Sequence, residues 1–200
     1  MMLPACDRPG CYEAGTDEAG RGCLAGPVFA AAVILPDDFS NDILNDSKKL
    51  TEKRRLELRE IIEREAVAWA VASVDAGEID SINILNASIL AMHRALDKLS
   101  VRPGRVIVDG NRFKPYGSVE WKTFVKGDGR FANIAAASIL AKTYRDEYME
   151  RMAVEYPAYR WDKNKGYPTR DHRKAIAEVG PSPIHRMTFT LLDPQMSLFD

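Results

Sequence analysis

The stretch "CYEAGTDEAGRGCLAGPVFAAAVIL", residues 11–35, decides the fold. It contains two segments with the length and apolar content of strands, residues 11–19 and 27–35, on either side of a glycine-bearing turn. Two strands joined by a short turn usually pair with each other, so we expect a hairpin here.

Two adjacent carboxylates, Asp17 and Glu18, end the first of these strands, directly before Gly20, Arg21 and Gly22. Successive side chains of a strand point to opposite faces, so neighbouring acids serve one site only where glycine bends the backbone at the strand end. This arrangement predicts a cation held by acids beside an exposed backbone that an anion can approach closely.

The rest of the chain alternates between helical and strand patterns. Apolar residues at spacings of three and four predict helices, and short apolar runs predict strands. The predicted helices are residues 50–65, 81–99, 133–156 and 171–179, with Ser81 as an N-cap, and the further strands are residues 66–75, 105–110 and 118–125. This order predicts an α/β chain with a mixed central sheet flanked by helices. We expect one domain over residues 1–200, with a core to about residue 156, a C-terminal helical extension over about 157–190 and a tail over 191–200.

The composition is typical of a globular chain, since 46% of the 200 residues are hydrophobic and 28% are charged. No apolar run has the length of a signal peptide or a membrane span, so we expect a cytoplasmic protein. The net charge of −1 excludes a protein coated in positive potential, but basic stretches such as "NRFK" and "DKNKGYPTRDHRK" leave nucleic-acid binding open. Cys6, Cys11 and Cys23 form no C-x-x-C motif and have no histidine at ligand spacing, so we expect free thiols.

Two more acids lie where elements end. Asp109 closes the apolar stretch "VIVD" before a glycine, and Asp128 lies between two glycines just before a predicted helix. Taken alone, an Asp-Gly pair is usually a turn. Converging carboxylates, however, repel one another unless cations neutralise them, and such hard oxygen ligands suit Mg²⁺ or Mn²⁺. Acids for metal, with arginine and lysine nearby for phosphate, are what two-metal phosphodiester hydrolysis requires.

Six motifs in one order make the chain resemble a known family. They are "DEAGRG", "DSKKL", "VDGN", "KGD" followed by "IAAASILAKTYRD", "NKGYPT" and "IHRMTF". Over nearly its whole length the chain closely resembles ribonuclease HII, the type 2 ribonuclease H of bacteria. The resemblance implies the ribonuclease H-like fold with a C-terminal helical extension. It also makes Asp17, Glu18, Asp109 and Asp128 the catalytic metal ligands.

The same resemblance implies contacts with substrate. The Gly20-Arg21-Gly22 backbone resembles the element that senses the ribose 2′-hydroxyl, the group that distinguishes RNA from DNA. Tyr167 matches a tyrosine that contacts the ribonucleotide and stacks near the following deoxyribose; without the family it would be an ordinary loop tyrosine. We interpret Asp146, inside a predicted helix, as a helix-face residue. The positions that resemble phosphate contacts are Ser47, Lys48, Lys49, Lys142 and Arg186.

The implied reaction is metal-dependent, endonucleolytic hydrolysis of the RNA strand of RNA–DNA hybrids, together with cleavage 5′ of ribonucleotides embedded in duplex DNA. It leaves 3′-hydroxyl and 5′-phosphate ends. The intact "GRG" after the acids disfavours the related ribonuclease HIII. Two hypotheses from other classes are a non-catalytic nucleic-acid-binding protein with this fold and a metal-dependent phosphatase for small molecules. The four retained acids speak against the first, and the basic stretches and the Tyr167 loop speak against the second.

The last residues suggest a partner. Gln195, Leu198 and Phe199 in "DPQMSLFD" resemble the Q-x-S/D-L-F peptide that docks into the bacterial sliding clamp. A glutamine and a Leu-Phe pair on a flexible end suit a small apolar pocket. The alternative is a tail folded onto its own domain. We expect a monomer that binds RNA–DNA hybrids and ribonucleotide-containing duplex DNA, and that does not bind membranes.

Overall fold

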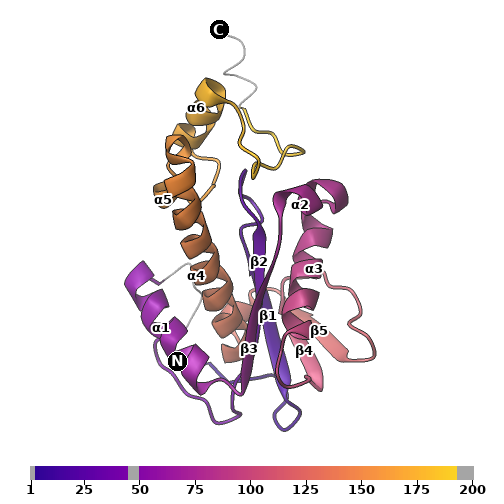
Figure 1. Cartoon of the computed structure of the whole chain (residues 1–200). Coiled ribbons are helices and arrows are strands. Elements are labelled where there is room, and N and C mark those ends of the chain that lie inside the picture. Colours follow the sequence, from indigo (N-terminus) through magenta and orange to yellow (C-terminus); the bar gives the residue numbers. More distant parts are fainter. Residues whose placement is uncertain (1–2, 45–49, 193–200) are drawn as a thin grey trace.

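The computed structural model of the chain describes residues 3–44 and 50–192. Its centre is a five-stranded sheet with the strand order β3-β2-β1-β4-β5 (Figure 1). β1 pairs antiparallel with β2 and parallel with β4, so the predicted hairpin and the predicted mixed sheet are both confirmed. The strands are β1 (Glu13–Ala19), β2 (Val28–Ile34), β3 (Ala68–Val74), β4 (Arg105–Asp109) and β5 (Glu120–Phe124).

Helices cover both faces of the sheet, as Figure 1 shows. α1 (Glu52–Glu65) and the long α4 (Ala132–Glu155) pack on one face, where alanines of α4 meet β2. α2 (Ala76–Ile82) and α3 (Ile84–Asp97) lie on the other face, with the apolar stripe of α3 against β2 and β3. β2 and most of β4 are therefore buried on both sides, which explains why these two strands read as continuous apolar runs.

The start of α4 is fixed directly against β1. A Cβ on Gly15 would lie 2.3 Å from the carbonyl carbon of Asn133, so only glycine permits this approach. The Asn133 amide donates to the Glu13 carbonyl at 2.7 Å and accepts from the Leu35 N–H at 2.8 Å. The contact sets the height of α4 over β1, and with it the position of every α4 side chain that faces the end of β1.

The predicted helix over residues 81–99 corresponds to α3, which begins only at Ile84, and the short α2 before it is not predicted. Asn83 adopts φ +66° between α2 and α3, and its side chain caps α3 by accepting from the Asn86 N–H at 3.1 Å. The prediction of Ser81 as an N-cap is wrong: Ser81 lies inside α2, where its hydroxyl donates to the Gly77 carbonyl at 3.0 Å. The cap of α2 is Asp75.

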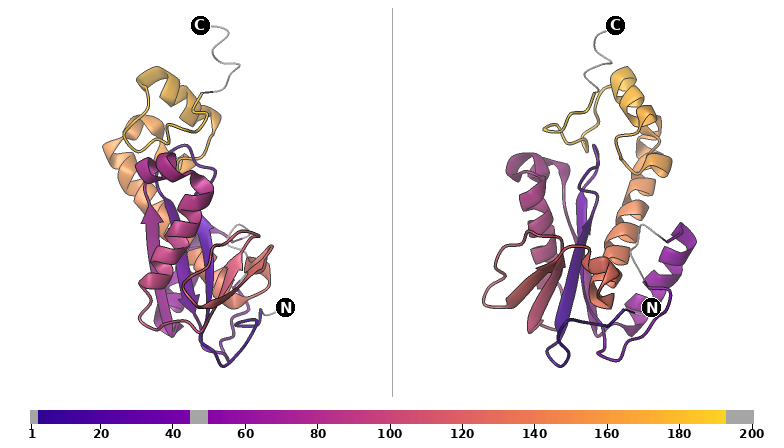
Figure 2. Two further views of the ribbon diagram at one scale, coloured as in Figure 1. Left: turned by 90° about the vertical axis from the view of Figure 1, so that its right-hand side faces the viewer. Right: turned by 180° about the vertical axis from the view of Figure 1, so that it is seen from behind.

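The C-terminal part rests on the far end of α4, which extends beyond the sheet (Figure 2). Two further helices follow α4, α5 (Trp161–Asn164), which the sequence pattern does not predict, and α6 (Arg170–Val179). Their apolar side chains cluster with Leu24 and Ala25 of the turn that follows β1. The C-terminal part is thus anchored to the turn beside the acids. None of the helices in the described residues has the length and apolar character of a membrane span.

Candidate active site

The acids predicted from sequence lie at one edge of the sheet. β1 and β4 are parallel and pair up to Thr16 and Val108, so Asp17 and Asp109 are the next residues on neighbouring strands. The Asp109 carboxylate accepts from the Gly127 N–H at 2.7 Å, and Gly127 directly precedes Asp128. Asp128 is buried within the 3₁₀ turn Gly127–Gly129, which begins the approach to α4. The fold therefore brings these three aspartates to the same sheet edge.

The environment of Asp17 disfavours the charged form of its carboxyl group. Its side chain is 6% exposed, and burial, followed by the negative charges of Glu18 and Asp109, raises the pKa of its carboxyl well above the usual range. Hydrogen bonds from Ser138 and from the Glu18 N–H, the latter at 2.7 Å, offset part of this effect. A divalent cation would relieve the same repulsion, so the donor set suits a hard metal ion.

The acids do not form a closed ligand cage. In residues 3–44 and 50–192, no three acidic, histidine or cysteine side chains come together closely enough to hold a metal ion. The negative charge of Asp109 contributes to the raised pKa of Asp17. A metal site built from all four acids stays a prediction.

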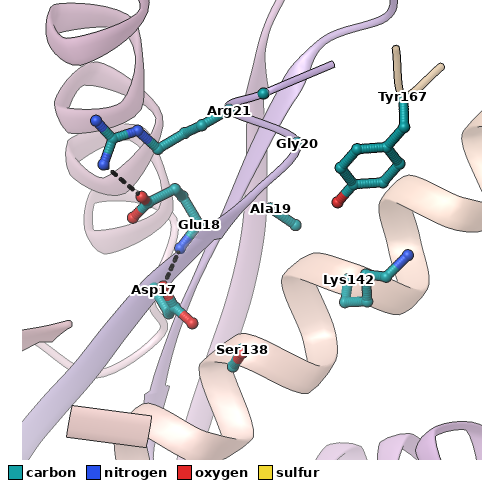
Figure 3. Close-up of a pocket in the computed structure, with 9 residues that line it drawn as sticks. Asp17, Glu18, Ala19, Gly20, Arg21, Ser138, Lys142 and Tyr167 are labelled. Atoms are coloured by element: carbon teal, nitrogen blue, oxygen red, sulfur yellow. Dashed lines mark hydrogen bonds and ion pairs between the residues drawn. The ribbon is translucent and has the colours of Figure 1, made fainter. Parts of the chain in front are cut away.

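A pocket of about 230 Å³ lies between the end of β1 and α4. Asp17 and Glu18 lie on one side of it, Ser138 and Lys142 of α4 on another, and Tyr167 reaches in from the C-terminal part (Figure 3). The remaining lining residues are Ala19, Gly20, Arg21 and Gly22. The pocket thus joins two of the predicted metal ligands to the predicted sugar-sensing turn and the predicted tyrosine.

Two buried arginines hold the turn between β1 and β2. Arg145 of α4 donates to the carbonyls of Ala25 at 3.0 Å and Pro27 at 3.1 Å. Its guanidinium also packs under Gly20, where φ is +94° and an added Cβ would lie 2.0 Å from Arg145 Nε. Arg145 is missed by reasoning from sequence, because it stands among the charged residues that follow the alanine-rich start of α4 and resembles a solvent-facing helix residue. Because Gly20 leaves room for Arg145, the pocket-lining backbone has a buried support.

Arg186, predicted as a phosphate contact, is buried, whereas a contact with a substrate phosphate requires an exposed side chain. It is fully buried, and its guanidinium donates to the carbonyls of Gly26 at 2.8 Å and Arg21 at 2.9 Å. Burial lowers the pKa of Arg186 to about 10. In this structure Arg186 shapes the turn from beneath and has no face toward a substrate phosphate.

Two ion pairs border the pocket. Arg21 Nη1 lies 3.1 Å from Glu18 Oε1, with the Arg21 side chain half exposed (Figure 3). Lys142 Nζ lies 2.6 Å from Asp146 Oδ2, so Asp146 is a buried helix residue that orients a predicted phosphate contact. A Cβ added to Gly22 would meet nothing within 4 Å, so this part of the turn is open.

Tyr167 lies in the loop between α5 and α6 and is 38% exposed. Burial, followed by the neighbouring Cys23 thiol, raises the pKa of the Tyr167 hydroxyl. Cys6, Cys11 and Cys23 are all free thiols, as predicted. The predicted contacts Ser47, Lys48 and Lys49 and the tail residues Gln195, Leu198 and Phe199 lie outside the described residues.

Comparisons with known proteins identify the family of the chain. The model of the ribonuclease HII family matches residues 14–192. Ribonuclease HII of Bacteroides thetaiotaomicron is 64% identical over 99% of both chains, and that of Bacteroides fragilis strain YCH46 is 65% identical over 100% of this chain and 99% of its own. Among solved structures, ribonuclease H2 from Pyrococcus horikoshii superimposes with a TM-score of 0.74 at 26% identity, covering 90% of this chain and 94% of that one. The ribonuclease HII of Archaeoglobus fulgidus, solved in complex with PCNA, gives 0.75 at 26% identity, covering 94% and 100%. The chain therefore belongs to the ribonuclease HII family of ribonuclease H hydrolases.

Proposed function

We propose that this ribonuclease H cleaves the RNA strand of RNA–DNA hybrids and cuts on the 5′ side of ribonucleotides embedded in duplex DNA. The observation that carries the proposal is the pocket that combines Asp17 and Glu18 with the Gly20–Gly22 turn and Tyr167. Acids for metal and a backbone for the ribose in one pocket suit a phosphodiester next to a ribonucleotide. A small phosphate ester would need neither the turn nor the tyrosine.

Asp17, Glu18, Asp109 and Asp128 would hold divalent cations, Mg²⁺ or Mn²⁺. When bound, two such ions would supply an activated water and stabilise the leaving oxygen, and cleavage would leave 3′-hydroxyl and 5′-phosphate ends. The raised pKa of Asp17 supports this assignment, since burial and the charges of Glu18 and Asp109, which a bound cation would offset, are what raise it.

The turn would recognise the sugar. Arg145 and Arg186 occupy turn carbonyls from beneath, so the backbone around Gly20 and Gly22 keeps one shape when substrate arrives. The open space at Gly22 would admit a ribose whose 2′-hydroxyl donates to and accepts from this backbone. Tyr167, across the pocket, would pack on the following sugar.

The first experiment compares Asp109→Asn with wild type. We expect Asp109→Asn to abolish cleavage of a duplex containing one ribonucleotide and of a hybrid, while binding to both is retained. Asp38→Asn, an exposed acid elsewhere, is the control and should cleave normally. Denaturing gels locate the cut, and resealing by DNA ligase tests for the 5′-phosphate. Undiminished cleavage by Asp109→Asn would contradict the metal assignment, and turnover of a small phosphate ester alone would favour the phosphatase hypothesis.

The tail would bind the sliding clamp. The ribonuclease HII of Archaeoglobus fulgidus was solved in complex with PCNA, and Gln195, Leu198 and Phe199 supply the predicted docking peptide here. Removing residues 195–200 should abolish binding to the bacterial clamp and leave cleavage of short duplexes unchanged. Unchanged clamp affinity would rule the tail out. We further propose a cytoplasmic monomer, which sedimentation of the purified protein would test for its oligomeric state.

A further inference from the structure

Behind Tyr167 lies a buried chain of hydrogen bonds that involves two of the three histidines. Trp161 Nε1 lies 2.9 Å from His172 Nε2, and His172 Nε2 lies 3.2 Å from His185 Nε2. At one end His185 Nδ1 lies 2.8 Å from the Ser182 N–H, and at the other His172 Nδ1 lies 2.9 Å from the Tyr167 carbonyl oxygen. His172 and Trp161 are fully buried and His185 is nearly so.

The donors in this chain allow only one proton arrangement for two neutral rings. His185 Nδ1 accepts from the Ser182 N–H, so the His185 proton is on Nε2 and is donated to His172 Nε2. The single lone pair of His172 Nε2 is shared between this N–H and the closer Trp161 indole N–H at 2.9 Å, so the His172 proton is on Nδ1. That proton is donated to the Tyr167 carbonyl. Burial lowers the pKa of both histidines, which keeps both rings neutral near pH 7.

The two residues before Tyr167 have left-handed backbone, Lys165 at φ +49° and Gly166 at φ +80°. They are held by Arg145, which donates to the Lys165 carbonyl at 2.9 Å, and by the Asn164 side chain, which accepts from the Gly166 N–H at 2.9 Å. At Tyr167 itself the contacts are fewer. The Tyr167 N–H donates to the Asn164 carbonyl at 2.9 Å, and its own carbonyl accepts from the Thr169 N–H at 2.8 Å. The His172 proton is the only side-chain contact to this backbone that the hydrogen bonds of the described residues record. The direction in which the ring enters the pocket depends on this anchoring.

We propose that His172 is a positioning residue for Tyr167, and that its Nδ1 proton, ordered by Trp161 and His185, sets how the tyrosine ring meets the substrate sugar. The proposal rests on the proposed function for its effect on cleavage, because only there does the ring position matter. It gives the buried histidines, which belong to no metal site in the described residues, a role in substrate discrimination.

Two substitutions at one position separate positioning from mere packing. Asn places its amide N–H close to where Nδ1 lies and can still donate to the Tyr167 carbonyl, whereas Gln places its polar group close to Nε2 and cannot. His172→Asn is therefore the matched control for His172→Gln. Both remove a buried ring and should lower the melting temperature.

We expect His172→Gln to lower kcat/KM on a duplex with one ribonucleotide by about tenfold or more, since displacement of a positioned group by ~1 Å can cost about 100-fold. His172→Asn should stay within about threefold of wild type. In a Tyr167→Ala background, His172→Gln should have no further effect, because the ring that it positions is gone. Equal losses for both substitutions, or an undiminished loss in the Tyr167→Ala background, would overturn the proposal and leave a structural role only.

A measurement on the protein without substrate tests the position of the His172 proton without any cleavage assay. Nitrogen-15 spectra of wild type should show the His172 proton on Nδ1 and the His185 proton on Nε2, with a through-hydrogen-bond coupling from His172 Nδ1 to the Tyr167 carbonyl carbon. The Tyr167 ring resonance should shift in His172→Gln and not in His172→Asn. If wild type cleaves neither substrate, the proposed function fails while these spectra still decide the positioning role. The opposite tautomers, or a missing coupling, would refute it even if neither variant folds.

Discussion

The buried His185 should make the protein lose stability in mild acid. Burial, and then the neighbouring His172, lower the pKa of His185 from 6.5 to about 4. Between these values the unfolded chain binds a proton that the folded chain refuses, so stability is fully present above pH 6.5 and falls as the pH drops towards 4. At about 1.36 kcal/mol per pH unit, His185 alone accounts for about 2 kcal/mol between pH 7 and 5 and for about 3 kcal/mol by pH 4. The lowered pKa of His172 acts in the same direction.

Urea unfolding followed by circular dichroism from pH 4.5 to 7 measures this loss. Carboxylates with a lowered pKa, such as Asp80, contribute only below this range, whereas the raised pKa of Asp17 acts in the opposite direction. The comparison that isolates the histidine is His185→Asn, whose side-chain oxygen can still accept from the Ser182 N–H. Its stability should depend on pH less steeply than that of wild type by about one proton. A slope in His185→Asn equal to that of wild type would refute the reasoning.

Three further substitutions test the packing around the acids. Gly15→Ala should lower the unfolding free energy by about 1–3 kcal/mol in urea titrations, because its Cβ meets the backbone of Asn133, which cannot rotate away; a stable Gly15→Ala variant would contradict the close approach of α4. Asp17→Asn should raise the melting temperature, by about 1 kcal/mol in stability, while abolishing cleavage, since it removes a buried charge beside other acids; a lower melting temperature would mean that the charge is already compensated. Arg186→Met should cost about 3 kcal/mol in the same titrations, because the carbonyls of Gly26 and Arg21 lose their donors, and a loss below about 1 kcal/mol would show that solvent replaces them.

The sequence predicts the hairpin and the sheet edge because their signals are local. Asp109 closes an apolar run before a glycine, Asp17 lies near the end of a predicted strand that leads into Gly20, and parallel neighbours place such ends together. The boundary between α2 and α3 at Asn83 cannot be predicted from apolar spacing, because that spacing continues through Asn83. An asparagine with left-handed backbone ends one helix and caps the next without disturbing that spacing. Periodicity reports which face is buried but does not report where the helix axis changes.

The buried arginines escape prediction for a different reason. Arg145 and Arg186 bind backbone carbonyls contributed by the turn that precedes β2, more than a hundred residues away in the chain. Backbone carbonyls leave no mark in a sequence, so the family motif marks Arg186 as important without showing that it faces inward. The histidine chain is similar: the absence of ligand spacing excludes a metal site, but the partner of each ring nitrogen follows only from the fold.

Three cationic side chains near the pocket are each paired with a group other than Asp17. Arg145 donates to turn carbonyls, Arg21 pairs with Glu18, and Lys142 pairs with Asp146. Each of these cations is thus engaged by a group other than the Asp17 carboxylate, whose pKa rises in response to its acidic neighbours. A nucleic acid phosphate placed at this edge would add a further negative charge beside Asp17 and its acidic neighbours. The divalent ions proposed above would supply positive charge at this point.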